Sequence, residues 1–193
     1  MTRPDLEAIA QWVKPGSRVL DLGCGDGSLL KHLWDHHQAH GYGVEIDDAE
    51  VLASMRNDVN VLQLDLESGL ALFQDGSFDH VILSETLQTI HRIEQLTREM
   101  LRVGREAIVS FPNFGHWRDR LQVLLGRMPV SEELPHQWYD TPNVHLCTLA
   151  DFESFCATHD VRVLERIVMQ GSRRVRFAPN LLGSVAVYRF EKA

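Results

Sequence analysis

The chain lacks the features that would cross-link it covalently or direct it to a membrane. Its 193 residues include three cysteines, Cys24, Cys147 and Cys156, an odd number with no CxxC pair. This pattern argues against a disulfide scaffold or a thiolate metal site and fits a reducing compartment. No apolar run approaches the roughly 18 residues of a membrane span, and Asp5 and Glu7 interrupt the start, where a signal peptide needs an apolar stretch. We therefore expect a soluble cytoplasmic protein with no membrane partner.

Positive charge is also scarce, because 19 Lys and Arg face 27 Asp and Glu, for a formal net charge of -8. A field of this sign repels nucleic acid and anionic lipid, so we expect no nucleic-acid partner. The remaining composition is ordinary for a globular protein, with 44% hydrophobic and 24% charged residues, which excludes wholesale disorder. At this length the prediction is a single domain over residues 1–193.

Short β-rich runs alternate with helical patterns through residues 1–111. The expected strands are 18–22, 41–46, 60–66, 78–85 and 107–111, and the expected helices are 27–37, 48–56 and one that ends at Val103. Alternation at this spacing predicts parallel strands with helical crossovers, and hence an α/β, doubly wound, Rossmann-like sheet. Two later runs, 161–170 and 184–191, are expected to form an antiparallel pair at the sheet edge.

Residues 112–147 interrupt this alternation with an irregular, aromatic insert. They hold two of the four tryptophans and four of the seven prolines, and Leu121, Leu124 and Leu125 predict one short helix. A long aromatic loop inside a compact domain is usually a lid or a binding loop. Three interpretations are open: a lid over a substrate pocket, aromatics that seal the insert against the sheet, or a surface that binds another protein. After the insert, a helix is predicted to start with Thr148 as its N-cap residue.

The strongest functional signal is the segment VLDLGCGDGSLLKHL, which begins at Val19. A predicted strand ends in this segment, and its glycines let the backbone turn sharply and approach a ligand closely. The helix that follows offers free N–H groups at its start. Ser28 stands where the dinucleotide fingerprint G-x-G-x-x-G needs its third glycine, and Asp21 and Asp26 would oppose a pyrophosphate. These residues disfavour a nicotinamide-dependent oxidoreductase and favour a positively charged ligand such as S-adenosylmethionine.

Acidic residues also end the next two predicted strands. Glu45 lies about 20 residues past the loop, where a carboxylate accepts hydrogen bonds from both ribose hydroxyls. Asp65 is expected within reach of an adenine amino group, and the neighbouring Ile46 and Leu66 could sandwich the adenine ring. A single acid at a strand end is more often a helix cap or a solvated turn residue. The joint occurrence with Asp21 favours an S-adenosylmethionine site at the carboxyl ends of the strands.

From about Arg18 onward the chain resembles class I S-adenosylmethionine-dependent methyltransferases and, more narrowly, the methionine biosynthesis protein MetW family. The segments that carry the resemblance are VLDLGCGDGSLL, GVEID, LDLESGL, SFDHVILSETLQ, MLRVGREAIVSFPNFGHW, GRMPV, LPHQWYDTPNVHLCTLADFE and CATHD. One departure is Glu85, where this family is expected to have glutamine. The resemblance implies a class I methyltransferase fold with a seven-stranded, mostly parallel sheet whose last strand is antiparallel. It also implies a role in methionine biosynthesis with a homoserine O-acyltransferase as partner.

The resemblance implies cofactor contacts for Asp21, Gly23, Gly25, Glu45 and Asp65. The complete set expected around S-adenosylmethionine or S-adenosylhomocysteine is Asp21, Gly23, Cys24, Gly25, Gly27, Glu45, Ile46, Asp65, Leu66 and Ser84. The family supplies no methyl acceptor. No metal site is expected, because His32 and His36 share a helix face without a carboxylate at zinc-motif spacing.

No catalytic residue is assigned by the sequence. Methyl transfer needs an in-line nucleophile and, for some acceptors, a base, and the candidates are Glu85, His116 and His145. After the fourth predicted strand the chain reads SETLQ rather than the Asn/Asp-Pro-Pro-aromatic motif of nucleobase methyltransferases, which disfavours a nucleobase acceptor. Two functions are open: an accessory protein that binds the acyltransferase and reports S-adenosylmethionine levels, or a catalytic small-molecule methyltransferase independent of that partner.

Overall fold

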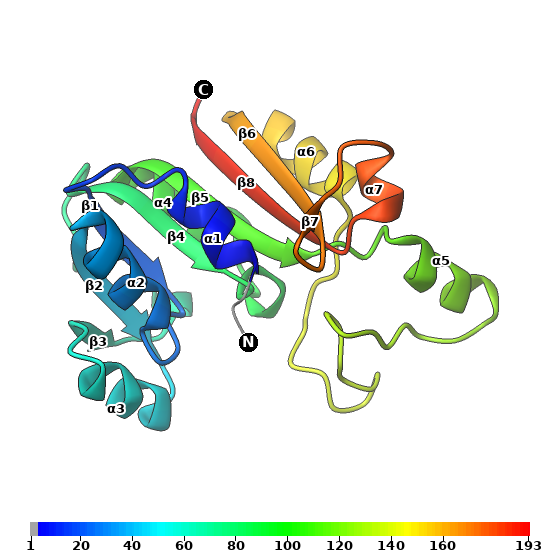
Figure 1. Ribbon diagram of the computed structural model, residues 1–193, viewed down its shortest axis with the longest axis horizontal. Helices are drawn as coiled ribbons and strands as arrows, with labels where there is room; N and C mark the ends of the chain where they lie inside the picture. Colours follow the sequence, from blue (N-terminus) through cyan, green and yellow to red (C-terminus); the bar gives the residue numbers. More distant parts are fainter. Residues whose placement is uncertain (1–3) are drawn as a thin grey trace.

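The computed structural model describes residues 4–193 and contains one mixed sheet with helices on both faces (Figure 1). The strands are β1 Arg18–Leu22, β2 His40–Glu45, β3 Val61–Gln63, β4 Phe78–Ser84, β5 Gly104–Pro112, β6 Val161–Gln170, β7 Arg173–Arg174 and β8 Val185–Lys192. Their order across the sheet is β3-β2-β1-β4-β5-β8-β6-β7. The predicted doubly wound α/β sheet is therefore confirmed.

The parallel part of the sheet runs from β3 to β5, and β8 pairs antiparallel with both β5 and β6. The predicted antiparallel pairing of the last two long runs is confirmed. The sheet has eight strands rather than the seven implied by the resemblance, because β7 adds a two-residue hairpin partner to the end of β6. No helix within residues 4–193 is long and apolar enough to cross a membrane.

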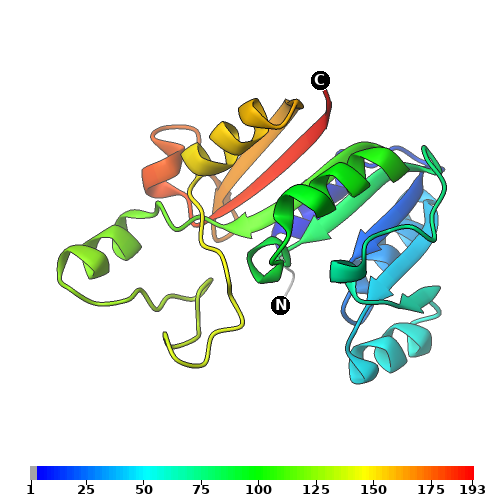
Figure 2. The same cartoon turned by 180° about the vertical axis from the view of Figure 1, so that it is seen from behind.

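Seven α-helices and two 3-10 helices accompany these strands within the described residues. Their bounds are α1 Pro4–Ala10, α2 Ser28–His37, α3 Asp48–Arg56, η1 Leu66–Ser68, η2 Leu87–Thr89, α4 Ile93–Val103, α5 Trp117–Leu124, α6 Leu149–Thr158 and α7 Pro179–Leu182. Helices α1 and α2 cover one face of the sheet (Figure 1), whereas the green α4 and the yellow α6 cover the other (Figure 2). Alternating the crossovers between faces is what opens a crevice at the strand ends.

Two predicted strands differ from the observed ones by more than one residue at an end. The strand expected at 60–66 ends at Gln63, because Asp65 turns the chain into η1 and its Oδ1 accepts the N–H of Glu67 at 2.8 Å. The strand expected at 107–111 runs from Gly104 to Pro112, since its first residues pair with β4 beyond the apolar run.

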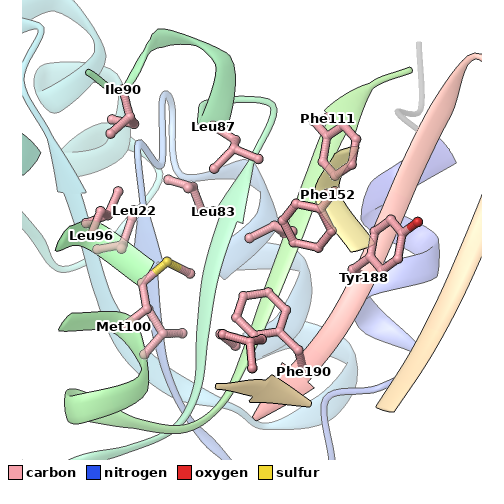
Figure 3. Close-up of a cluster of buried hydrophobic side chains, with 14 of the residues drawn as sticks. Leu22, Leu83, Leu87, Ile90, Leu96, Met100, Phe111, Phe152, Tyr188 and Phe190 are labelled. Carbon is pink, nitrogen blue, oxygen red and sulfur yellow. The ribbon is translucent and has the colours of Figure 1, made fainter. Parts of the chain in front are cut away.

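The larger core cluster lies between the sheet and helices α4 and α6, as Figure 3 shows. Phe152 of α6 packs against Phe111 of β5 and Tyr188 of β8, with ring centroids 5.1 and 4.7 Å apart. Met100 and Leu96 fill the neighbouring space under α4 (Figure 3). These contacts fix the antiparallel strands to the parallel ones, and so hold the carboxyl ends of β4 and β5 in place.

Thr148 begins α6 with a reciprocal capping box, as the sequence predicts. Its side chain accepts the N–H of Asp151, and Asp151 Oδ2 accepts the N–H of Thr148 at 2.9 Å. Two N–H groups at the helix start are satisfied in this way.

Replacing this cap should weaken the fold by a measurable amount. We expect Thr148→Ala to lower the free energy of unfolding by about 1 kcal/mol, measured by urea denaturation. The exposed Ser154→Ala in the same helix is the matched control, and it should not lower the free energy of unfolding, because alanine is the better helix former. Equal effects of the two substitutions would contradict the capping assignment.

Candidate functional site

The loop after β1 is tied to the end of β2 by backbone hydrogen bonds. The register pairs Leu22 with Val44, and the N–H groups of Gly23 and Cys24 both donate to the carbonyl of Val44, at 2.8 and 3.1 Å. The order of the strands changes direction between β1 and β4, which is the topological switch point of the sheet. The predicted glycine loop therefore lies at the position where ligands bind in this kind of sheet.

The carboxylate of Glu45 also holds the loop to the end of β2 by hydrogen bonds to backbone N–H groups. Its Oε2 accepts the N–H of Gly25 at 2.9 Å, and its Oε1 accepts the N–H groups of Ile46 and Asp47 at 2.7 and 3.0 Å. Three charge-assisted hydrogen bonds fix this carboxylate in position. Glu45 thus presents an oriented carboxylate at the end of the second strand.

The glycines of the loop serve different purposes. At Gly23 (φ +69°) an added Cβ would lie 2.6 Å from Oγ1 of Thr86, so close packing requires glycine there. At Gly25 (φ +53°) the nearest atom would be Oε2 of Glu50 at 3.8 Å, so this residue faces open space. A ligand can therefore approach the backbone most closely at Gly25.

Helix α3 clamps the loop from the outside, and the sequence reasoning missed this contribution. Ser54 is fully buried and its Oγ donates to the carbonyl of Gly25 at 2.8 Å, while Asn57 Nδ2 donates to the carbonyl of Asp26 at 2.8 Å. A Cβ on Gly27 would meet Oγ of Ser54 at 2.8 Å. No motif marks these two residues, because the contact depends on how α3 folds back over the loop.

Asp21 lies on β1 between the neighbouring strands, opposite Gly43 of β2 and Ile82 of β4. It is 2% exposed, so its carboxyl group is a buried acid one residue before the end of the strand. A buried carboxylate needs hydrogen-bonding or cationic partners to remain ionised. Asp21 therefore lies buried at the carboxyl end of β1, directly before the glycine loop.

The third predicted acid, Asp65, follows β3 and is exposed. Its side chain caps η1, which is the common alternative role for an acid at a strand end. The N–H of the preceding Leu64 donates to the carbonyl of Glu45 at 3.0 Å, so Asp65 still follows the strand beside β2. Ile46 at the end of β2 is 60% exposed, whereas Leu66 packs against the larger core cluster. An exposed isoleucine beside Glu45 offers an apolar surface to a planar ring.

Ser84 at the end of β4 belongs to a buried hydroxyl–carboxylate cluster. Ser84 Oγ and Ser110 Oγ both donate to Oδ2 of Asp5, at 2.9 and 3.1 Å. Asp5 is buried and comes from α1, 79 residues before Ser84 in the sequence. The sequence reasoning missed Asp5 as part of the site, because such a distance leaves no local pattern.

The three candidate bases do not form one group. Glu85 has a left-handed backbone (φ 51°) just after β4, and its N–H donates to the carbonyl of Ser110 at 3.0 Å. The N–H of His145 donates to Gln88 of η2 at 3.0 Å, so the insert returns beside the segment that follows Glu85. His116 is buried at the start of α5 instead. A left-handed non-glycine residue at a strand end is a strained position of the kind found at functional sites.

Two histidines of α2 lie on one face of the helix. The rings of His32 and His36 stack with centroids 4.3 Å apart, and burial lowers the pKa of His32. Within residues 4–193 no group of three or more His, Cys, Asp or Glu side chains is arranged to hold a metal ion.

The fold is that of S-adenosylmethionine-dependent methyltransferases. The chain superimposes on such an enzyme from Mesorhizobium loti with a TM-score of 0.68 at 15% identity, covering 98% of this chain and 96% of the other. It superimposes on one from Archaeoglobus fulgidus with a TM-score of 0.68 at 16% identity, covering 97% and 91%. The cyclase SpnF has a TM-score of 0.69 at 17% identity, covering 98% and 80%. At these identities the likeness concerns the fold alone.

The family is shown by sequence. The profile of the methionine biosynthesis protein MetW family matches residues 3–190. The bifunctional methionine biosynthesis protein MetXA/MetW of Rhodopirellula baltica is 39% identical over 203 residues, which cover 97% of this chain and 32% of that protein. The chain therefore belongs to the MetW family, which associates it with methionine biosynthesis and confirms the resemblance drawn from the sequence.

A second relative resembles the chain over a shorter stretch. The 2-phytyl-1,4-naphtoquinone methyltransferase of Synechococcus elongatus is 34% identical over 131 residues, which cover 61% of this chain and 56% of that enzyme. The chain thus spans about a third of the bifunctional protein and just over half of this methyltransferase.

The three cysteines should be unreactive in the folded protein. Burial raises the pKa of the Cys24, Cys147 and Cys156 thiols to about 12, and the charge of Asp21 adds to the effect at Cys24. Because the thiolate is the nucleophile, only roughly one thiol in ten thousand is reactive at pH 8. We expect Ellman's reagent to react with all three thiols rapidly in urea and orders of magnitude more slowly without it. Equal rates in the two conditions would contradict the burial of these residues.

Proposed function

We propose that the chain is an S-adenosylmethionine-binding component of methionine biosynthesis that acts in a complex with a homoserine O-acyltransferase. The single observation that carries the partnership is the bifunctional relative, in which MetXA and MetW are parts of one protein. The match to that relative covers 97% of this chain. Fusing two proteins keeps them at a high effective concentration, which is of use when they act together.

The residues at the carboxyl edge of the sheet fit S-adenosylmethionine. The oriented carboxylate of Glu45 is suited to a ribose diol, and the exposed side chain of Ile46 to an adenine face. The open space beside Gly25 leaves room for a ligand at the loop, and the buried acid Asp21 favours a cationic group. When bound, this cofactor supplies a methyl group activated by its sulfonium ion.

Catalytic methyl transfer to a small molecule is a second candidate, favoured by the strained backbone of Glu85. That residue follows β4, next to the hydroxyl cluster of Ser84 and Ser110, where it could act as a base. The fold alone does not decide between the candidates, because SpnF shares it and is a cyclase. Incubation with methyl-labelled cofactor and a metabolite extract separates them: label transfer that is lost in Glu85→Ala supports catalysis.

Cofactor binding is tested by calorimetric titration with S-adenosylhomocysteine. We expect Glu45→Ala to weaken binding about 5- to 150-fold, since lost hydrogen bonds to a polar ligand cost about 1 to 3 kcal/mol. Glu45→Gln keeps one acceptor oxygen and should lose less. Glu94→Gln, an exposed carboxylate of α4, is the matched control and should bind as the wild type does. Unchanged affinity in a folded Glu45→Ala variant would refute the ribose assignment.

The partnership is tested by co-purifying the chain with the homoserine O-acyltransferase of the same organism. We expect a stable complex and a rate of acyl transfer that changes when the chain is added, because a fused relative implies joint action. The acyltransferase with an unrelated protein of similar size and charge is the control. No association, together with an unchanged rate, would overturn the proposed function.

A further inference from the structure

Residues 117–146 form an arm that leaves the sheet at the end of β5 and returns beside η2. Figure 1 shows α5 and the chain that follows it extending outward beyond the arrowhead of β5. The return is fixed by two bonds, because the N–H groups of Val144 and His145 both donate to the carbonyl of Gln88, at 2.8 and 3.0 Å. The arm is therefore anchored at both ends to the carboxyl edge of the sheet.

The segment just before the arm is held in place by hydrogen bonds of Asn113. The side chain of Asn113 is buried and bonds three ways: Nδ2 donates to the carbonyls of Gly183 and Asn180 at 2.8 and 3.1 Å, and Oδ1 accepts the N–H of Gly115 at 3.0 Å. These contacts lock the start of the arm to α7. Because its start is held by these hydrogen bonds, the arm presents its surface in a defined position.

Hydrogen bonds also join two segments in the middle of the arm. Gln122 of α5 pairs with Val130 twice: Nε2 donates to the carbonyl at 3.3 Å, and Oε1 accepts the N–H at 3.1 Å. Leu134 is buried in the wall of a small cavity shared with Leu87 and Phe111. The segment thus folds back on itself, and Leu134 lies beside residues of the core.

The outer side of this arm is apolar and exposed. Leu121 and Leu124 belong to α5, and Leu125 and Met128 follow its end. In the sequence the four recur at i, i+3, i+4 and i+7, a spacing typical of residues that pack against a core. Leu124 is instead 82% exposed and Leu125 69%. We call these four residues, with Trp138 and Tyr139, the arm surface.

The exposure of Trp138 and Tyr139 contradicts the interpretation that aromatic residues seal the insert against the sheet. They are 73% and 71% exposed and pack edge to face against each other, with ring centroids 5.7 Å apart. Aromatics that sealed the insert against the sheet would be buried, so that interpretation is wrong for these two residues. Exposed apolar surface of this extent marks an interaction site, and Trp and Tyr are enriched among residues that dominate binding energy.

The arm also suits a protein partner by its charge. It contains three arginines and four acidic residues, so it contributes a formal charge of only -1 to the chain's -8. The remaining charge of -7 lies outside it. The arm is therefore a part of the chain that adds little to its negative field.

We infer that the arm surface is the docking surface for the homoserine O-acyltransferase. This inference rests on the proposed function, because the occupant is taken from the fused relative, in which the two proteins share one chain. The partner would present a complementary apolar groove to the Leu124–Leu125 stripe and to the Trp138–Tyr139 pair. Since the arm is bonded to Gln88, and Gln88 Nε2 donates to the carbonyl of Glu85, the docked protein would lie beside the carboxyl edge.

The test is a binding titration of the full chain against the purified acyltransferase. We expect Leu124→Glu and Trp138→Ala each to weaken the complex by about tenfold or more, as residues that anchor interfaces do. The matched controls are Leu72→Glu and Trp34→Ala, which are 72% and 55% exposed and lie outside the arm. They should bind within about twofold of the wild type. Each variant is checked for folding by its S-adenosylhomocysteine affinity, which should be unchanged because no arm residue lies in the glycine loop.

The outcomes separate the two claims. If the wild-type chain does not bind the acyltransferase, the proposed function and the docking surface both fail. If the wild type binds and the arm variants bind equally well, the docking assignment is overturned while the proposed function stands. Sedimentation of each variant alone completes the test: loss of a homodimer, without loss of the acyltransferase complex, would assign the arm surface to a second copy of this chain instead.

Discussion

Leu22 lies opposite Val44 in the parallel ladder of β1 and β2, and the rest of the site depends on this register. It places the carbonyl of Val44 under the loop, where two N–H groups bind it, and brings Gly25 to the carboxylate of Glu45. A shift by one residue would turn Glu45 to the other face of the sheet and separate these atoms. One backbone pairing thus positions both the loop and its acid.

The same edge of the sheet leads to the arm. Asp5 joins the ends of β4 and β5 through Ser84 and Ser110, and the chain leaves β5 at its far end to form the arm. The arm returns to the same edge at Gln88, whose carbonyl accepts two of its N–H groups. The carboxyl edge of the sheet and the arm surface are therefore connected by short segments of chain.

The sequence was informative where the chemistry is local. The strand–loop–helix segment around Gly25, the acid Glu45 and the capping box of Thr148 are set by residues close together in the chain, and they were predictable. Asp5 and Ser54 were not, because each reaches the site from a distant segment through side-chain hydrogen bonds. The exposure of the arm surface could not be predicted either. The apolar spacing from Leu121 to Met128 looks the same in the sequence whether these side chains pack against a core or against a partner.

Hydrogen–deuterium exchange of the chain with the acyltransferase, with and without S-adenosylmethionine, tests both claims together. We expect the acyltransferase to protect amides within residues 117–146 from exchange. We expect the cofactor to protect amides at 23–28 and 45–47. If neither region gains protection while both added molecules are in excess, the chain does not bind the cofactor at the carboxyl edge and does not dock on the acyltransferase through the arm.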